Sequence, residues 1–146
     1  MTDNIFYRSG YKYQLQADYS VMTGIRPEWD IVSEFYSIEQ SGLVTGVAGY
    51  CFDGATKALD SLDFMRGALI HDIGCQAIIE GRLPYEFKGA VDKELIKICD
   101  EDGMSKMRQW YVYKAVDKFS CTQKNPHPLC SAPDKEAVHV ANEGVS

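Results

Sequence analysis

The first third of the chain alternates between apolar and polar residues. In YKYQLQADYSV, residues 11–21, tyrosine, leucine, alanine and valine fall on one face, and lysine, glutamine, aspartate and serine on the other. A period of two is typical of a half-buried β-strand. The segments WDIVSEFYSI and LVTGVAGYCF predict two more strands, and the turn sequences GIRPE and EQSG separate them. We therefore expect a small antiparallel sheet at the N-terminal end.

The hydrophobic period changes from Leu62 onward to one that favours helices. The three predicted helices cover residues 62–81, 86–102 and 105–119. Gly81 and then Pro84 end the first helix, and Ser105 is the expected N-cap of the third. The connection between the first two is short, so they should be antiparallel neighbours. The predicted fold class is α+β, a sheet followed by three helices that pack on it.

The length and composition indicate one domain with a tail. The chain has 146 residues, of which 45% are hydrophobic and 25% charged, as in ordinary globular proteins. We expect residues 1–121 to form a single α+β domain. Residues 122–146 mix proline, charged and small residues and are predicted to be loop or disordered. His127 and His139 lie in this tail and are expected to be solvated.

The net charge of −6 makes nucleic acid an unexpected partner, because phosphate contacts require clustered lysine and arginine. It also argues against simple electrostatic docking on an anionic membrane. The N-terminal sequence MTDNIFYRSG lacks the apolar segment of a signal peptide. No apolar run approaches the roughly 18 residues of a transmembrane helix, so we expect neither feature.

Five cysteines are present, none in a CxxC pair. Cys75 and Cys99 lie in predicted helices, where an unreactive buried thiol is expected. Cys121 and Cys130 bracket a short loop containing proline and would form a disulfide in an exported protein. The expectation is instead a chain made in a reducing cytosol.

The first predicted helix carries His71 in its apolar middle. The residues three and four positions away from it are small or apolar, so burial without a partner would cost about 1–3 kcal/mol. On the second helix Asp92 borders the apolar stripe, about level with His71. A carboxylate that binds an imidazole fixes its tautomer and stabilises the imidazolium, which is how a general base is oriented. The alternative is a structural hydrogen bond between two helices.

Asp72 points about 100° away from His71 around the helix and needs another partner. A hard cation such as Ca²⁺ is one alternative, with loop oxygens near Asp53 as further ligands. The other alternative is that Asp72 binds Arg66, Arg82 or a backbone amide. A metal-dependent phosphohydrolase of the H…HD…D type is disfavoured, because no histidine precedes His71.

The third predicted helix is rich in aromatic residues. They are Trp110, Tyr111, Tyr113 and Phe119. Packing on the sheet is the expected reason for them, and a membrane-facing surface is the alternative.

The segments GYCFDGATKALDSLDFMRGALIHDIGCQ and AVDKELIKICDEDGMSKMRQWYVYKAVDKF closely resemble a family common in tailed phages and prophages. It is catalogued as domain of unknown function 1353. Its pattern is a W-D-G-x-S loop, a helix with H-D-x-L-Y, and A-D-x-x-F in the next helix. The resemblance covers roughly residues 7–120. It implies a viral or prophage source and carries no established activity.

More distantly, the order of motifs resembles the phospholipase A2 superfamily. There a glycine-rich calcium loop precedes a helix bearing H-D-x-C-Y, and an antiparallel helix supplies an aspartate. The resemblance implies that His71 is the base that activates water and that Asp92 orients the His71 ring. It also implies that Asp72 binds Ca²⁺. Loop oxygens would complete the calcium shell, from Phe52, Asp53, Gly54 and Ala55. The chain departs from the pattern at Gly74 and Cys75, where the superfamily has a disulfide cysteine and a tyrosine.

The implied function is Ca²⁺-assisted hydrolysis of a phospholipid or another ester by a phage-encoded protein. The host cytoplasm or the phage virion is its expected location. The alternative is a non-enzymatic virion or tail component, or a phage–host interaction protein. Its partners would be other phage structural proteins, and its His–Asp pair would only fasten two helices.

Overall fold

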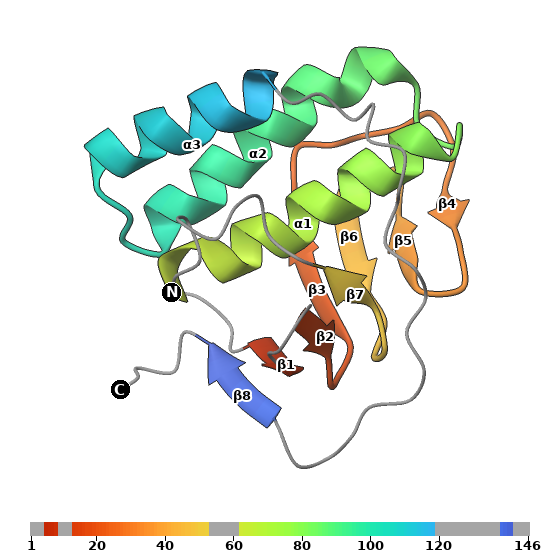
Figure 1. Cartoon of the computed structure of the whole chain (residues 1–146). Helices are drawn as coiled ribbons and strands as arrows, with labels where there is room; N and C mark the ends of the chain where they lie inside the picture. Colours follow the sequence, from red (N-terminus) through yellow and green to blue (C-terminus); the bar gives the residue numbers. More distant parts are fainter. Residues whose placement is uncertain (1–4, 9–12, 53–61, 119–137, 142–146) are drawn as a thin grey trace.

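The computed structural model describes residues 5–8, 13–52, 62–118 and 138–141 (Figure 1). Seven of the described strands precede three α-helices along the chain, which confirms the predicted α+β class. In chain order the elements are β1 (Ile5–Arg8), β2 (Tyr13–Leu15), β3 (Tyr19–Met22), β4 (Ile31–Val32), β5 (Tyr36–Ile38), β6 (Leu43–Gly46), β7 (Cys51–Phe52), α1 (Leu62–Ile79), the 3₁₀ helix η2 (Tyr85–Phe87), α2 (Lys88–Glu101), α3 (Lys106–Lys118) and β8 (Val138–Ala141).

The described strands form two antiparallel sheets, where the sequence predicts one. The first has the strand order β7-β2-β1-β8, and the second has the order β3-β6-β5-β4. β8 lies within residues 122–146, which are predicted to be loop or disordered. Its residue Val140 pairs with Phe6 of β1. The first sheet therefore joins segments from both ends of the chain.

The predicted strand over residues 11–21 is divided between the two sheets. β2 belongs to the first sheet and β3 to the second, and the exposed residues Ala17 and Asp18 lie between them. The carboxylate Oδ1 of Asp18 accepts a hydrogen bond of 2.8 Å from the backbone nitrogen of Ala48. This bond holds the bend at which the chain passes from one sheet to the other.

Each of the other two predicted strands is also divided into two strands in the structure. β4 and β5 pair with each other, with Ile31 opposite Ile38. The backbone nitrogen of Ser33 donates to the carbonyl of Tyr36 at 2.8 Å and closes their turn. β6 and β7 lie in different sheets. Between them Gly49 has φ of 101°, a left-handed conformation that favours glycine.

The helices are stacked outward from the sheets. α1 packs on β6 and β7, α2 packs on α1, and α3 packs on α2 (Figure 1). α1 and α2 run in opposite directions, as their short connection predicts. After α1, Gly81 has φ of 79° and the backbone nitrogen of Arg82 donates to the carbonyl of Ala77 at 2.9 Å. Ser105 Oγ accepts a 3.2 Å bond from the backbone nitrogen of Arg108, which confirms the predicted N-cap of α3.

The hydrophobic core surrounds α1. Its fully buried members include Leu15, Ile38, Val44 and Phe52 from the strands, Leu69, Ile70 and Ile73 from α1, and Val91 and Leu95 from α2. None of the described helices has the length and apolar character needed to cross a membrane.

The aromatic side chains of α3 lie on its outer face. Trp110 and Tyr111 are each 58% exposed, and Phe119 lies outside the described residues. α3 instead buries Val112 and Val116 as it packs on α2. The prediction that these aromatics pack on the sheet is therefore wrong, because α3 packs on a helix through other residues and leaves Trp110 and Tyr111 exposed.

Candidate functional site

One face of α1 is shaped for close contact with α2. Gly67, His71 and Gly74 are spaced by four and three residues, so they lie on the same face of the helix. A Cβ atom at Gly67 would lie 2.6 Å from Leu95 Cδ1, and one at Gly74 would lie 2.8 Å from both methyl carbons of Val91. The two glycines therefore let the backbones approach on either side of His71.

This approach brings His71 to Asp92, the residue that follows Val91 on α2. His71 Nε2 and Asp92 Oδ1 are 2.7 Å apart. His71 is 9% exposed and Asp92 is 1% exposed, so the bond is shielded from water. The contact predicted from the sequence is present. Its catalytic role stays a prediction.

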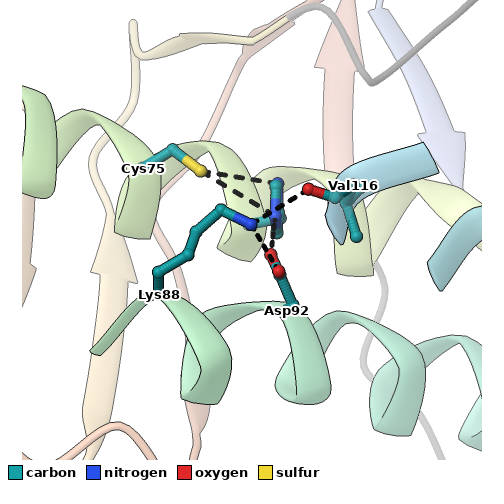
Figure 2. Close-up of polar contacts among 5 residues, drawn as sticks. Cys75, Lys88, Asp92 and Val116 are labelled. Atoms are coloured by element: carbon teal, nitrogen blue, oxygen red, sulfur yellow. Dashed lines mark hydrogen bonds and ion pairs between the residues drawn. The ribbon is translucent and has the colours of Figure 1, made fainter. Parts of the chain in front are cut away.

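The second oxygen of Asp92 belongs to a partner that the sequence analysis missed. Asp92 Oδ2 forms an ion pair with the Nζ of Lys88, which is also buried (Figure 2). The same Nζ donates a 2.9 Å hydrogen bond to the carbonyl of Val116 on α3. Lys88 precedes Asp92 by four residues, and this helical spacing of opposite charges was the available signal.

Cys75 lies one helical turn beyond His71 on α1. Its Sγ is 3.8 Å from both ring nitrogens of His71 (Figure 2). Cys75 is partly exposed and disulfide-bonded, so the prediction of a buried unreactive thiol is wrong at this position. Helical periodicity indicates on which face of α1 Cys75 lies, but it does not reveal that the sulfur has a covalent partner. The predicted Cys121–Cys130 pair lies outside the described residues.

Cys51 and Cys99 provide a contrast to Cys75. Cys51 is disulfide-bonded as well, but it is buried in β7. Cys99 is a free, fully buried thiol, and burial raises its pKa to about 12. The prediction of an unreactive thiol is thus confirmed for Cys99, because ionising it inside the core is unfavourable.

The hydrogen bond to Asp92 sets the chemistry of the His71 ring. A carboxylate accepts the proton of Nε2, so the lone pair of the neutral ring is on Nδ1. Among the described residues, the polar atom found beside Nδ1 is the Cys75 sulfur. The arrangement provides an oriented imidazole whose basic nitrogen faces away from its carboxylate.

The predicted calcium ligands are only partly within the described chain. Asp72 is partly exposed on α1, next to His71. Phe52 is fully buried at the end of β7, a strand that contacts α1. Asp53, Gly54 and Ala55 lie outside the described residues. Within the described ranges, no three acidic, histidine or cysteine residues gather as a metal site.

The two arginines proposed as partners of Asp72 bind other carboxylates. Arg66 Nη1 is 2.6 Å from Asp102 Oδ1 in a largely buried pair. Arg82 Nε is 3.0 Å from Glu80 Oε1. Of the two tail histidines, His139 lies in β8 and His127 lies outside the described residues.

Comparison with known proteins adds no relative: no protein-family model, no curated protein and no solved structure matches this chain.

Proposed function

We propose that this protein is a phage-encoded hydrolase of phospholipid or related esters, with His71 as general base and Asp92 as the carboxylate that orients it. The observation that carries the proposal is the 2.7 Å bond between His71 Nε2 and Asp92 Oδ1 across two helices. It leaves the basic nitrogen Nδ1 for a substrate water. A base held in this way typically contributes about 10²–10⁴-fold to a rate.

The proposed reaction moves one proton through His71. Nδ1 removes a proton from water, whose oxygen attacks the ester carbonyl, and the imidazolium that forms is stabilised by Asp92. When the tetrahedral intermediate collapses, Nδ1 returns the proton to the leaving alcohol oxygen. Lys88 keeps Asp92 in place, since it binds the carboxylate oxygen that His71 does not use.

Ca²⁺ is the cofactor proposed for this reaction. The partly exposed carboxylate of Asp72 provides the hard oxygen ligand that Ca²⁺ prefers, and it lies next to the base on α1. Backbone oxygens of residues 52–55 are the other proposed ligands. When bound, Ca²⁺ would polarise the ester carbonyl.

The virion is the proposed location rather than the reducing host cytoplasm. Cys51 and Cys75 are both disulfide-bonded, and disulfides persist in oxidising surroundings.

Calorimetric titration with Ca²⁺, together with release of fatty acid from phospholipid vesicles, tests the proposal. We expect wild-type protein to bind Ca²⁺ saturably and hydrolyse the lipid, and Asp72→Asn to lose both properties. His71→Gln should bind Ca²⁺ normally but lose about 10²–10⁴-fold in rate. Glu86→Gln, an exposed substitution that also removes one negative charge, is the matched control. Folded wild-type protein that neither binds millimolar Ca²⁺ nor hydrolyses any ester would refute the proposal.

A non-enzymatic phage component is the second candidate, and the outer face of α3 favours it. This face carries Met107, Trp110, Tyr111 and Tyr113, all exposed. The rings of Trp110 and Tyr111 are in contact, with 5.5 Å between their centroids. Exposed apolar side chains that gather in this way are typical of protein interaction surfaces. In this case His71→Gln would lower the stability of the protein, and neither variant nor wild type would show hydrolysis.

A further inference from the structure

The outer face of α3 is apolar and positively charged. Met107 is followed three and four residues later by Trp110 and Tyr111, and Trp110 is followed four residues later by Lys114, so these exposed side chains share one side of the helix. The ammonium of Lys114 lies 5.5 Å from the centre of the Trp110 ring. α3 contains four basic residues and one acidic residue, in a chain whose net charge is −6. We call these four side chains the basic face.

The segment that leads through β4 combines exposed apolar side chains with the opposite charge. Residues 28–34, EWDIVSE, include three acidic residues and no basic one, and all three acids are exposed. Trp29 is 54% exposed and Val32 is 68% exposed, whereas Ile31 between them is buried. β4 is the last strand of the second sheet. We call residues 28–34 the acidic face.

The two faces lie on opposite sides of the molecule. Figure 1 shows α3 at the left and β4 at the right, with α1 between them. α3 is attached to the rest of the protein through α2, and β4 through β5. One molecule therefore cannot bring its own two faces together, whereas two copies can.

We propose that the basic face of one copy binds the acidic face of the next, so that the protein assembles head to tail. Each face presents one exposed tryptophan, a residue type that is enriched where interfaces gain most of their binding energy. Contact between two basic faces would bring like charges together, which disfavours a symmetric pair through α3. A head-to-tail contact leaves one unused face at each end, so the assembly continues to a closed ring or a filament.

The charged groups of both faces are available for this contact. Lys106, beside the basic face, pairs with Asp100 at 2.9 Å, but 83% of its side chain is exposed, and exposed ion pairs contribute little. It can therefore exchange this partner for an acid of a second copy. On the acidic face, Asp30 Oδ1 accepts a 2.9 Å hydrogen bond from the backbone nitrogen of Gln40. This bond holds the segment in place before association and so lowers the entropy that association costs.

Sedimentation velocity of the full chain tests the inference. We expect the average mass of the wild type to rise beyond that of two chains as its concentration increases from about 1 to about 500 µM. In about 0.5 M salt, compared with about 0.05 M, the association should weaken by about tenfold or more, because salt screens the attraction between the faces.

Two double variants, each with one altered face, distinguish head-to-tail assembly from other contacts. Trp110→Ala with Lys114→Glu alters the basic face, and Trp29→Ala with Glu28→Lys alters the acidic face. Each variant alone should stay monomeric. An equal mixture of the two should form a dimer that does not grow, because each variant contributes its one intact face. Formation of this dimer also shows that both variants are folded.

Tyr85→Ala with Lys93→Glu is the matched control, since both residues are exposed and lie outside the two faces. It should assemble like the wild type. A wild type that stays monomeric at the highest concentration, or an association that does not respond to salt, would overturn the inference. Dimers of the acidic-face variant alone would overturn it as well, because two basic faces would then pair with each other.

A lipid surface is the other occupant that the experiment recognises. Monomeric wild type that binds vesicles of phosphatidylcholine and phosphatidylglycerol, and loses this binding in the basic-face variant, would assign α3 to a membrane and overturn self-assembly. The sedimentation samples contain neither ester nor Ca²⁺, so their outcome is independent of the proposed hydrolysis.

Discussion

Each oxygen of the Asp92 carboxylate has its own partner, and the two partners differ in charge. His71 Nε2 lies 2.7 Å from Oδ1, and Lys88 Nζ pairs with Oδ2. Lys88 also donates to the carbonyl of Val116, so one ammonium connects α2 to α3. A buried ion must be compensated, because its removal from water costs several kcal/mol. The charge of Lys88 provides this compensation, so the cluster is neutral overall when the imidazole is neutral.

Replacing Lys88 by methionine tests this compensation. Lys88→Met keeps most of the side-chain volume but leaves a carboxylate oxygen and the Val116 carbonyl without their donor. We expect the free energy of unfolding to fall by about 3–5 kcal/mol, measured by urea denaturation. Lys93→Met, at an exposed position of the same helix, should change it by no more than about 0.5 kcal/mol. Similar small losses in both variants would mean that Asp92 does not depend on Lys88.

The sequence predicts the pair of His71 and Asp92. For Lys88 it offers the helical spacing to Asp92 as a signal of pairing, but it does not indicate that Lys88 is buried. His71 stands in an apolar stretch, where a polar ring must have a partner, and Asp92 is the acid that borders the facing stripe. Lys88 begins its helix, and a lysine there is usually solvated. Its burial depends on α3, which covers this end of α2 and contributes the Val116 carbonyl. That contact joins segments 28 residues apart, so local pattern does not reveal it.

At the scale of elements, helix ends were predictable and strand limits were not. Gly81 and Ser105 mark helix ends through local effects. Gly81 takes a left-handed backbone conformation after α1, and the Ser105 hydroxyl caps the first turn of α3. The break between β2 and β3 depends on Asp18, which is held by a bond from Ala48, 30 residues away. The alternation of apolar residues passes through this break without a change. A signal that lies in a distant contact cannot be read from periodicity alone.

The approach of α1 to α2 depends on the absence of a side chain at Gly74. Gly74→Ala should favour the helix by about 1 kcal/mol through propensity, but its Cβ would lie 2.8 Å from both Val91 methyls. Overpacking of this kind costs about 1–3 kcal/mol. We therefore expect a net loss of up to about 2 kcal/mol in unfolding free energy, measured in urea. Gly89→Ala, where nothing lies within 4 Å of the added carbon, is the control and should be neutral or stabilising.

A second substitution shows whether the loss comes from this contact. Val91→Ala removes the two methyl groups that the new carbon would meet, so the double variant should be more stable than the sum of the single changes predicts. Additive losses would place the effect of Gly74→Ala elsewhere. Because Asp92 follows Val91, relief of the clash should also restore the distance between α2 and His71.

Across the whole molecule, α1 is attached on two sides by hydrogen-bonded polar groups. His71 faces α2, whereas Glu80, just past the end of α1, faces the strands. Tyr36 of β5 donates a 2.5 Å hydrogen bond to Glu80 Oε1, and Gln76 Nε2 donates to Oε2 at 2.8 Å. The Tyr50 hydroxyl donates in turn to Gln76 Oε1 at 2.9 Å. The helix that carries the candidate site is thus fixed to the sheet independently of the site.

The attachment through Glu80 should make stability depend on pH in the acid range. Burial opposes ionisation, but hydrogen bonds from Tyr36 and Gln76 and the charge of Arg82 hold the pKa of Glu80 below its ordinary 4.5. The unfolded chain therefore binds this proton at a higher pH than the folded one. The stabilisation is fully present above about pH 4.5 and is lost as pH falls through the folded value.

Glu80→Gln removes this titration while it keeps an oxygen that can accept from Tyr36. We expect the wild type to exceed the variant in unfolding free energy at about pH 7, and the difference to shrink as pH falls below about 4.5, measured in urea. Glu86→Gln, exposed in η2, controls for the loss of one negative charge. A difference between wild type and Glu80→Gln that stays constant with pH would show that Glu80 acts through its shape and not its charge. The link from α1 to the sheet would then persist in acid, and acid unfolding would have to begin elsewhere.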